Sequence, residues 1–304
     1  MSIKVIIVTY NSSKSISNCI EALSLASKNY LLYIIVVDNA STDNTLVVLD
    51  NLYPELPVIQ LTENTGYAHA NNIGLSEILA HDQNDTAILI INPDIILPPD
   101  SLDSLFALLT SGSEIGMVSP AVSKLENESP EAIFRRYRRF RSLWGIPMAK
   151  SFQGQVRIVE VDRLPGCCML IKPIVLEKIG LFDEAYFLYW EELDLCLRTR
   201  RANFKLLINT DIVIKHNINE GERPHRIYYM YRNQFYFSIK NYGYLLGAAF
   251  LIRRLITLFC EIWHFLRLQR FDLLQTIWSG LVAGIKGEKG RSSNQHATPK
   301  ISWN

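Results

Sequence analysis

Residues 4–11 read KVIIVTYN, and this stretch decides which fold the chain adopts. Its β-branched, apolar run is typical of a strand buried on both faces, which occurs almost only in parallel sheets covered by helices. A polar turn follows, and residues 15–27 then carry apolar side chains at helical spacing. The stretch therefore predicts the first strand and the first helix of an α/β domain.

The same alternation continues over the first 120 residues. Buried strands are predicted at 33–37, 58–61 and 87–91, with helices at 43–53 and after Gly66. Strands that alternate with helices predict a doubly wound, mostly parallel sheet with helices on both of its faces. In the second half of the chain, two further separate strands are predicted at 204–208 and 212–215.

Composition limits the class of protein. The chain has 304 residues, 48% of them hydrophobic, which is enough for one large α/β domain with a C-terminal appendage. A net charge of +1 argues against a general nucleic-acid binder. Five cysteines without a Cys-x-x-Cys pair predict free thiols in a reducing compartment. Because no signal peptide is visible, we expect a cytoplasmic protein.

Polar side chains follow the first two strands. Thr9 and Asn11 end the first strand, and Asp38 and Asn39 end the second. Ligands of open parallel sheets bind beyond the carboxyl ends of the strands. These four residues are therefore candidates for one binding pocket.

A turn and a helix start at residues 63–74 extend this candidate pocket. Asn64, Gly66 and Asn71 lie in this segment, where glycine permits close backbone approach and the helix-start amides can face a diphosphate. The glycine spacing matches neither standard phosphate-binding loop, so the segment alone is a weak signal.

Asn92-Pro93-Asp94 follows the strand at 87–91. A carboxylate at a strand end, beside a phosphate-binding turn, is where a divalent cation would bridge to a diphosphate. The alternative is a turn-forming Asn-Pro-Asp sequence. His216 stands directly after the strand at 212–215, and it is either a second metal ligand or a structural histidine.

Residues 186–201, YFLYWEELDLCLRTRR, place three acids in an apolar frame. Burial raises the pKa of a carboxylate and makes it a better proton acceptor near neutral pH. Glu191, Glu192 and Asp194 are therefore candidate catalytic residues. The alternative is a helix whose acids stabilise its N-terminus and whose arginines stabilise its C-terminus.

Two other segments suggest surfaces. Residues 134–141, FRRYRRFR, could grip an anionic group such as a lipid diphosphate, or form a solvated basic loop. Residues 241–290 are predicted to form amphipathic helices, with uncharged runs too short to span a bilayer. Their basic borders favour contact with an anionic membrane, while packing on the catalytic domain or a dimer interface is the alternative. Residues 291–304 are predicted to be a disordered tail.

With these residues in view, the chain resembles the family 2 glycosyltransferases, in particular the bacterial rhamnosyltransferase-like branch. The resemblance covers roughly residues 3–245. It rests on an ordered set of motifs, namely 8–11, 37–43, 64–68, 71–74, 92–94, 165–166, 191–198, His216 and 231–233. It implies a GT-A fold with a nucleotide-sugar-binding half at 1–120 and an acceptor-binding half at 121–240.

The resemblance also implies roles for single residues. Asp38, with Thr9 and Asn11, would hold the base or ribose of the donor. Asp94 would anchor Mg²⁺ or Mn²⁺, although Asn92 stands where many relatives have another acid, and His216 matches a further metal-side position. Glu192 occupies the place of the family's catalytic Asp in a Glu-Asp-x-Asp pattern. It is the expected base of an inverting mechanism, and Glu191 or Asp194 could share its role.

The function implied is transfer of rhamnose or another hexose from a dTDP- or UDP-linked donor. The acceptor would be a saccharide or a polyprenyl-diphosphate-linked saccharide, in the synthesis of a cell-surface polysaccharide such as lipopolysaccharide. The protein would then be peripheral on the inner face of the cytoplasmic membrane. The departures at Asn92 and Glu192 keep open a non-catalytic, nucleotide-sugar-binding scaffold protein. A nucleotidyltransferase ranks last, because the chain lacks a glycine-rich basic N-terminal loop.

Overall fold

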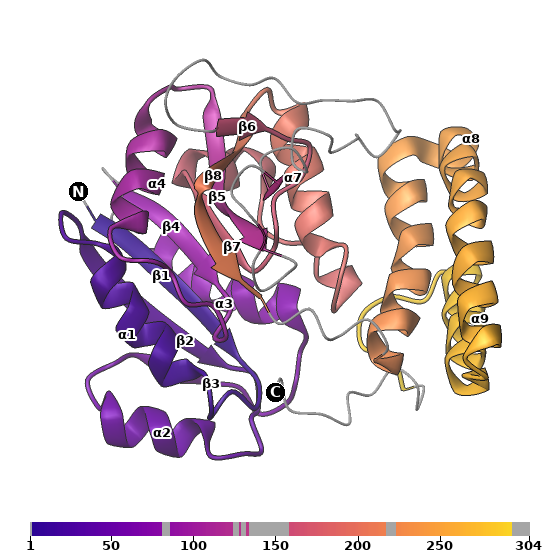
Figure 1. Cartoon of the computed structure of the whole chain (residues 1–304), viewed down its shortest axis with the longest axis horizontal. Coiled ribbons are helices and arrows are strands. Elements are labelled where there is room, and N and C mark those ends of the chain that lie inside the picture. The colour runs from indigo at the N-terminus through magenta and orange to yellow at the C-terminus, as the bar shows by residue number, and fades with distance from the viewer. Residues whose placement is uncertain are drawn as a thin grey trace.

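The computed structural model describes residues 2–80, 86–123, 128, 132–133, 158–216 and 223–293. A central sheet is flanked by helices, and a separate layer of long helices stands beside it (Figure 1). The basic stretch 134–141 and residues 294–304 of the predicted tail lie outside the described residues.

The sheet has eight strands in the order β3-β2-β1-β4-β7-β5-β8-β6. The strands are β1 (Ser2–Thr9), β2 (Leu31–Asp38), β3 (Val58–Gln60), β4 (Thr86–Ile91), β5 (Ile115–Ser123), β6 (Ile158–Glu160), β7 (Cys168–Ile171) and β8 (Lys205–Lys215). All pairs among β1 to β4 are parallel, as is β5 with β8. Only β7 and β6 run against their neighbours. The predicted doubly wound, mostly parallel sheet is confirmed.

Helices cover both faces of this sheet. The helical segments are α1 (Ile16–Ala26), α2 (Thr45–Leu52), α3 (Tyr67–Leu79), α4 (Ser101–Thr110), α6 (Pro173–Ile179), the 3₁₀ turn η1 (Glu184–Tyr186), α7 (Glu191–Arg201), α8 (Pro224–Arg267) and α9 (Phe271–Ile285). Successive side chains of a strand point to opposite faces. Accordingly, Val5 and Ile7 pack in a core with α1 and α4, while Ile6 packs in a second core with α3.

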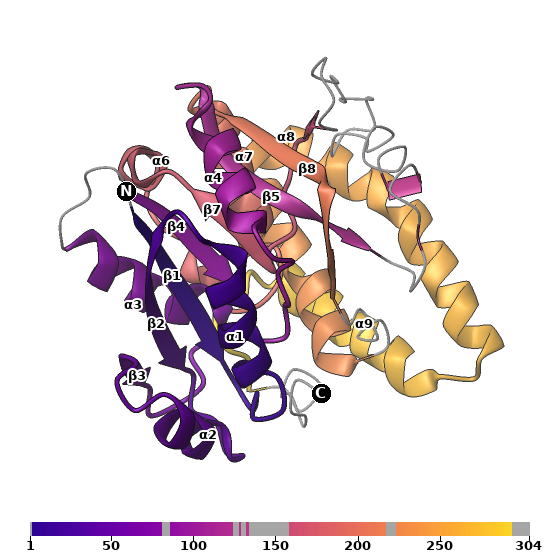
Figure 2. The ribbon, with the colours of Figure 1, turned by 60° about the vertical axis from the view of Figure 1, so that its left-hand side comes forward.

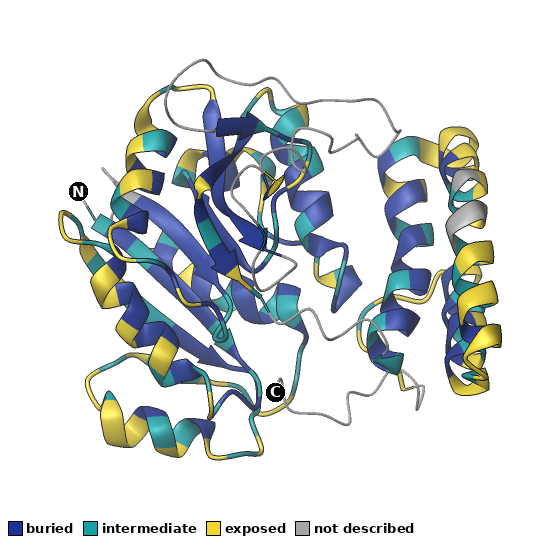
Figure 3. Cartoon of the chain, viewed as in Figure 1, coloured by how far each residue is buried: buried dark blue, intermediate teal, exposed yellow. Residues whose placement is uncertain are grey.

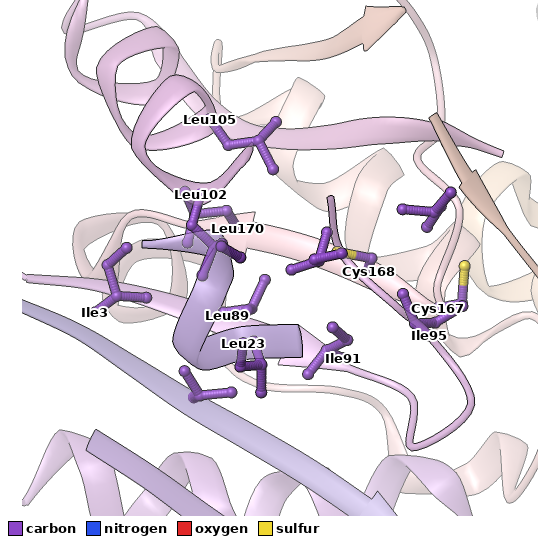
Figure 4. Close-up of a cluster of buried hydrophobic side chains, with 14 of the residues drawn as sticks. Ile3, Leu23, Leu89, Ile91, Ile95, Leu102, Leu105, Cys167, Cys168 and Leu170 are labelled. Atoms are coloured by element: carbon purple, nitrogen blue, oxygen red, sulfur yellow. The ribbon is translucent and has the colours of Figure 1, made fainter. Parts of the chain in front are cut away.

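The first of these cores is built from aliphatic side chains. Figure 4 shows Leu23 of α1 and Leu102 and Leu105 of α4 gathered over the side chains of the sheet, with Cys167 and Cys168 at one end of the cluster. Burial raises the pKa of the Cys167 thiol to about 12, so this thiol is protonated at neutral pH. Both cysteines are free, as the sequence predicts, and behave as small apolar side chains.

The prediction of two separate strands at 204–208 and 212–215 is wrong, because both belong to the single strand β8. Pro120 of β5 pairs with Asn209, and the next residue, Ala121, pairs with Val213. The three extra residues form a bulge in which the Asn209 side chain accepts a hydrogen bond from the amide of Asp211. Turn-forming residues can thus lie inside a strand when they are the extra residues of a bulge.

Helix α8 is a helical hairpin rather than one rod. Gly243 has φ 71° and ψ −179°, which breaks the helix into residues 224–242 and 244–267. The Tyr231 hydroxyl donates to Glu261 Oε2 at 2.7 Å, so the two halves run side by side in opposite directions. Figure 1 shows them as two adjacent columns. The change of direction lies close to the domain boundary predicted at residue 240, although the division into domains stays a prediction.

Helix α9 packs against the first half of α8 through two glycines. A Cβ on Gly280 would lie 2.6 Å from the carbonyl oxygen of Tyr228, and one on Gly284 would lie 2.9 Å from that of Arg232. The Gly-x-x-x-Gly spacing therefore lets the two backbones touch. The resulting three-helix layer packs against the segment that carries Tyr186 and Trp190.

Candidate active site

The ends of β1 and β2 are joined by a buried carboxylate. Asp38 Oδ1 accepts from the Thr9 hydroxyl at 2.9 Å and from the Ser41 hydroxyl at 2.5 Å, and Oδ2 accepts from the Ser41 amide at 2.9 Å. Asp38 and Thr9 are fully buried. Asp38 thus fixes the turn beneath the pocket, and its predicted contact with the donor base or ribose stays a prediction.

Asparagine side chains hold the neighbouring turns. Asn11 Oδ1 accepts from the amides of Thr42 and Asp43 at 2.7 and 3.2 Å. Asn39 accepts from the Thr65 amide at 2.8 Å and donates to Asn64 Oδ1 at 3.2 Å. These bonds connect the loops that follow β1, β2 and β3, and they place Asn39 and Asn64 at the carboxyl edge of the sheet.

Gly66 brings the start of α3 against the segment before α7. Its φ is +88°, and a Cβ there would lie 2.3 Å from the carbonyl oxygen of Phe187. The next amide, that of Tyr67, donates to the same oxygen at 2.8 Å. Asn71, one turn further along, is buried and donates to the carbonyl oxygen of Tyr67. Only glycine fits position 66, since it needs both the left-handed conformation and the missing side chain.

A pocket opens at this edge. Its lining residues come from six separate stretches of the chain, namely Val8, Tyr10, Asn39, Asn64, Gly66, Tyr67, Asn92, Pro93, Asp94, Phe187, Leu188, Arg223 and His225. Five of the predicted site residues are in this set. Three aromatic rings and three asparagine side chains are among the lining residues, a combination that suits a nucleoside.

Asp94, which lines the pocket, lies beside His216, the other predicted metal ligand. His216 Nε2 lies 3.5 Å from Asp94 Oδ2, and the Asp94 side chain is about one-third exposed. The described residues hold no cluster of three His, Cys, Asp or Glu side chains. One carboxylate and one imidazole fit a divalent cation that takes its remaining ligands from diphosphate and water.

The pocket is also lined by Arg223 and His225, which the sequence interpretation missed. They flank Pro224 at the start of α8. Burial and the nearby Arg223 and Arg226 guanidinium groups lower the pKa of His225 to about 4, so the free protein holds it neutral. An arginine followed by a helix-starting Pro-His was the available sequence signal, and only the fold brings it into the same pocket as Asp94.

Glu191 and Glu192 begin α7 and differ in their surroundings. Glu191 is buried, its Oε2 accepts no hydrogen bond from the described residues, and burial beside Glu192 raises its pKa well above the usual range. Glu192 is half-buried, and burial raises its pKa, opposed by hydrogen bonds from backbone amides and by Arg163. Both acids are therefore stronger bases than exposed glutamates.

Glu192 adjoins the pocket through Gly166 and Tyr67. A Cβ on Gly166 would lie 3.1 Å from Glu192 Cβ and Cγ, so the glutamate packs directly on this glycine. The Gly166 carbonyl oxygen accepts from the Tyr67 hydroxyl at 2.9 Å, and Tyr67 lines the pocket. Burial and the carboxylates of Glu191 and Glu192 raise the pKa of Tyr67, so it stays a hydrogen-bond donor.

Asp194, the third acid, is enclosed by cations and polar donors. Its side chain is 0% exposed and bonds to Arg198 Nε at 2.7 Å, Lys240 Nζ at 2.8 Å and Asn241 Nδ2 at 3.1 Å. These contacts tie α7 to the first half of α8. No atom of Asp194 lines the pocket.

The segment before α7 has a strained backbone. Phe187, Tyr189 and Trp190 have φ values of 63°, 64° and 78°, which bulky side chains rarely adopt. Asn233 of α8 holds this segment, because its Nδ2 lies 2.9 Å from the carbonyl oxygens of Tyr186, Leu188 and Tyr189. The buried Arg232 donates to the Tyr186 carbonyl oxygen at 2.8 Å. Phe187 and Leu188 are thereby presented to the pocket.

Comparison with known proteins identifies the family. The family model described as "Glycosyl transferase family 2" matches residues 4–180, more than half of the chain. The chain belongs to this family of glycosyltransferases. The resemblance stated from the motifs is therefore confirmed, and so is the expectation of an enzyme.

Two curated relatives extend the match beyond residue 180. The "Low-salt glycan biosynthesis hexosyltransferase Agl10" of Haloferax volcanii is 28% identical over 241 residues, which are 77% of this chain and 74% of that protein. The "N-acetylglucosaminyl-diphospho-decaprenol L-rhamnosyltransferase" of Mycobacterium tuberculosis is 25% identical over 222 residues, 66% of this chain and 71% of that protein.

Solved structures confirm the GT-A fold of this glycosyltransferase. A mannosyltransferase from Pyrobaculum calidifontis, solved with GDP-Man and Mn²⁺, superposes with a TM-score of 0.56 at 18% identity, covering 93% of this chain and 86% of that one. TarS residues 1–349 of S. aureus, solved with UDP-GlcNAc, gives 0.54 at 20% identity, covering 84% and 72%. At such identities the likeness concerns the fold alone.

Proposed function

We propose that this glycosyltransferase moves a hexose, rhamnose included, from a dTDP- or UDP-linked donor to a saccharide acceptor carried on a polyprenyl diphosphate, with inversion at the anomeric carbon. The observation that carries the proposal is the junction at Gly166. There Glu192, which we propose takes the acceptor proton, packs on Gly166, whose carbonyl oxygen accepts a hydrogen bond from Tyr67 of the pocket. Family membership supports the reaction class.

The relatives support the choice of sugars and acceptor. One is named a hexosyltransferase of glycan biosynthesis, and the other a rhamnosyltransferase acting on N-acetylglucosaminyl-diphospho-decaprenol. A role in cell-surface glycan assembly follows from the same proposal, and lipopolysaccharide is one product that it would include.

The ionisable groups that line the pocket or lie beside it have proposed parts in the reaction. Glu192 accepts the proton of the acceptor hydroxyl as its oxygen attacks the anomeric carbon and the bond from that carbon to the diphosphate oxygen breaks. Arg223 stabilises the charge that develops on the departing diphosphate. Asp94 and His216 would hold Mg²⁺ or Mn²⁺, which neutralises diphosphate charge when bound. Tyr10 and Tyr67 offer faces on which the donor base can stack.

A donor screen tests the proposal. The full chain is incubated with dTDP-rhamnose, UDP-glucose, UDP-galactose, UDP-N-acetylglucosamine and GDP-mannose, each with Mg²⁺ or Mn²⁺ and with or without EDTA. Release of nucleoside diphosphate and binding by calorimetry are measured in parallel. A polyprenyl-diphosphate N-acetylglucosamine acceptor is then added.

The expected result is metal-dependent release of one nucleoside diphosphate, accelerated by the lipid-linked acceptor, with inverted product by NMR. Tight binding of a donor without any release, even with acceptor present, would instead establish the non-catalytic scaffold function. Equal rates with and without EDTA would remove the metal-binding role of Asp94 and His216.

A further inference from the structure

The second half of α8 and helix α9 expose an apolar surface that the sugar-transfer reaction does not use. Twelve of the twenty large apolar side chains that are exposed in the described part of the chain lie between residues 244 and 285. These helices stand on the side of the molecule away from α1 and α2 (Figures 1 and 2), and Figure 3 shows exposed residues along them.

The exposed residues of α8 form one stripe. Ile252, Leu255, Phe259, Trp263 and Leu266 follow one another at spacings of three and four, which places them on one face of the helix. The opposite stripe, with Phe250 and Phe265, is buried against the rest of the protein. The second half of α8 therefore has two apolar faces, of which the fold buries one and leaves the other exposed.

Helix α9 continues this surface. Phe271, Trp278 and Ile285 are 65%, 68% and 72% exposed and are seven residues apart, so they also share one face. A short turn joins α9 to α8, and Phe265 packs with Leu273 and Ile277. The two helices are thus antiparallel neighbours. We call the five α8 residues and these three α9 residues the outer face.

Cationic residues border the outer face at both ends. At the α8–α9 turn, Arg267 lies over the Trp263 ring at 5.1 Å, and Arg270 lies beside Asp272. At the far end of α9, Lys286 and Lys289 outnumber Glu288. Between residues 244 and 291 there are seven basic and three acidic residues. An apolar surface with tryptophan and arginine at its edge suits the interface of an anionic bilayer.

We propose that the outer face is a membrane-docking surface that lies flat on a bilayer containing anionic lipid. None of the helices in the described ranges is long and apolar enough to cross a membrane. A second copy of the chain is a poorer occupant, since both ends of the face are net cationic and either orientation of a symmetric pair would bring like charges together. This inference concerns attachment and holds independently of which sugar is transferred.

The test is vesicle binding by the full chain. Vesicles of phosphatidylcholine alone, and with phosphatidylglycerol added, are sedimented with wild-type protein and with a Phe259→Glu/Trp278→Glu variant. The matched control is Val47→Glu/Leu52→Glu, which changes two apolar residues of α2 that are also more than half exposed. Far-ultraviolet circular dichroism and lipid-free donor hydrolysis check that each variant folds.

Wild type and control are expected to bind the anionic vesicles, less at high salt, because exposed charges are screened. The outer-face variant should lose binding at least ~10-fold, because two exposed aromatic side chains that would insert into the bilayer are replaced by charges. Equal binding of variant and wild type, or no binding of wild type, would overturn the proposal. The proposal would also be overturned if light scattering showed a wild-type dimer and a monomeric variant while neither protein bound lipid.

This design separates attachment from catalysis. Vesicle binding without sugar transfer would uphold the docking surface and refute the proposed function. Transfer to a water-soluble acceptor without vesicle binding would do the reverse.

Discussion

The donor side of the pocket and the acidic segment before α7 are built in different ways. On the donor side, polar residues at the ends of β1 and β2 satisfy one another, as Thr9, Asp38 and Ser41 do. In the acidic segment, three bulky residues have positive φ, and Glu191 is buried without a partner for Oε2 among the described residues. The second segment is held by Asn233, which is more than forty residues away in the sequence.

This difference indicates that the donor side of the pocket serves binding and the acidic segment serves the chemical step. Satisfied hydrogen bonds make a rigid platform, as binding of a conserved chemical group such as a diphosphate requires. Strain and unpaired carboxylates cost stability, and they persist only where surrounding contacts impose them, which is common at reacting centres. Substitutions on the two sides should therefore separate chemistry, binding and stability.

The largest effect is expected from Glu192→Gln, which removes the proposed base. The kcat for sugar transfer should fall by roughly 10²–10⁴-fold, the usual contribution of general base catalysis, while donor affinity stays unchanged. Because burial raises the pKa of Glu192, wild-type kcat should also fall as pH decreases through a value above the ordinary glutamate range. Stopped assays across pH with lipid-linked acceptor measure both.

Glu177→Gln, at an exposed position of α6, is the matched control and should behave as wild type. A Glu192→Gln enzyme that retained full kcat would show that this acid takes no part in the chemistry.

Asp94→Asn tests the platform side. It keeps the shape of the turn but weakens cation binding, so the Mn²⁺ concentration for half-maximal rate should rise about tenfold or more. Titration of metal at saturating donor measures the change. The control is Asp100→Asn, which removes a surface carboxylate paired with Lys28. An unchanged metal requirement would place the cation elsewhere.

Asn233→Ala tests whether α8 positions the acidic segment. Without the amide donor, the strained residues from Phe187 to Trp190 can relax, and a small displacement of the reacting groups should lower kcat about tenfold. The KM for donor should rise by a smaller factor than kcat falls, because the amides around Asn39 stay in place and only Phe187 and Leu188 of the pocket belong to the relaxing segment. Steady-state kinetics measures the change in kcat and the change in the KM for donor separately.

Gln234→Ala replaces the next buried amide, whose Oε1 accepts no hydrogen bond from the described residues. If both variants lost kcat and stability alike, Asn233 would be a packing residue without a positioning role.

The smallest effect concerns stability at Glu191. Burial raises its pKa in the folded state, so its favourable contribution is present below the pKa of the unfolded chain and is lost as pH rises through the folded pKa. Glu191→Gln removes that loss and should raise Tm at pH 8 by roughly 2–4 °C, the shift expected from about 1 kcal/mol. Calorimetry should show a smaller gain at pH 5.

A Tm gain that is equal at both pH values would mean that ionisation of Glu191 does not destabilise the folded state. Glu184→Gln is the natural contrast, because hydrogen bonds from Asn72 and His69 lower the pKa of Glu184 despite partial burial. That substitution should lower Tm at pH 8.

The sequence alone determined the sheet, the polar strand ends and the family. The β-branched, apolar run from Val5 to Val8 predicts a buried strand without knowledge of its neighbours. Asn11 follows this strand and Asp38 ends the next one, and turn chemistry of this kind depends on only a few adjacent residues. Asp94 and His216 were each predicted from strand ends as metal ligands, and the structure places them 3.5 Å apart. The bulge in β8 was not, since Asn209 and Asp211 look like an ordinary turn until β5 pairs on both sides of them.

Only the tertiary structure decided which residues that are distant in the sequence line the pocket. Arg223, His225 and Phe187 line it because α8 and the segment before α7 are folded against the sheet, and no local pattern encodes that approach. The hairpin at Gly243 likewise decided which apolar stripe of α8 is buried and which is left exposed. Hydrophobic periodicity is a property of one helix, whereas burial depends on the partner that the rest of the chain supplies.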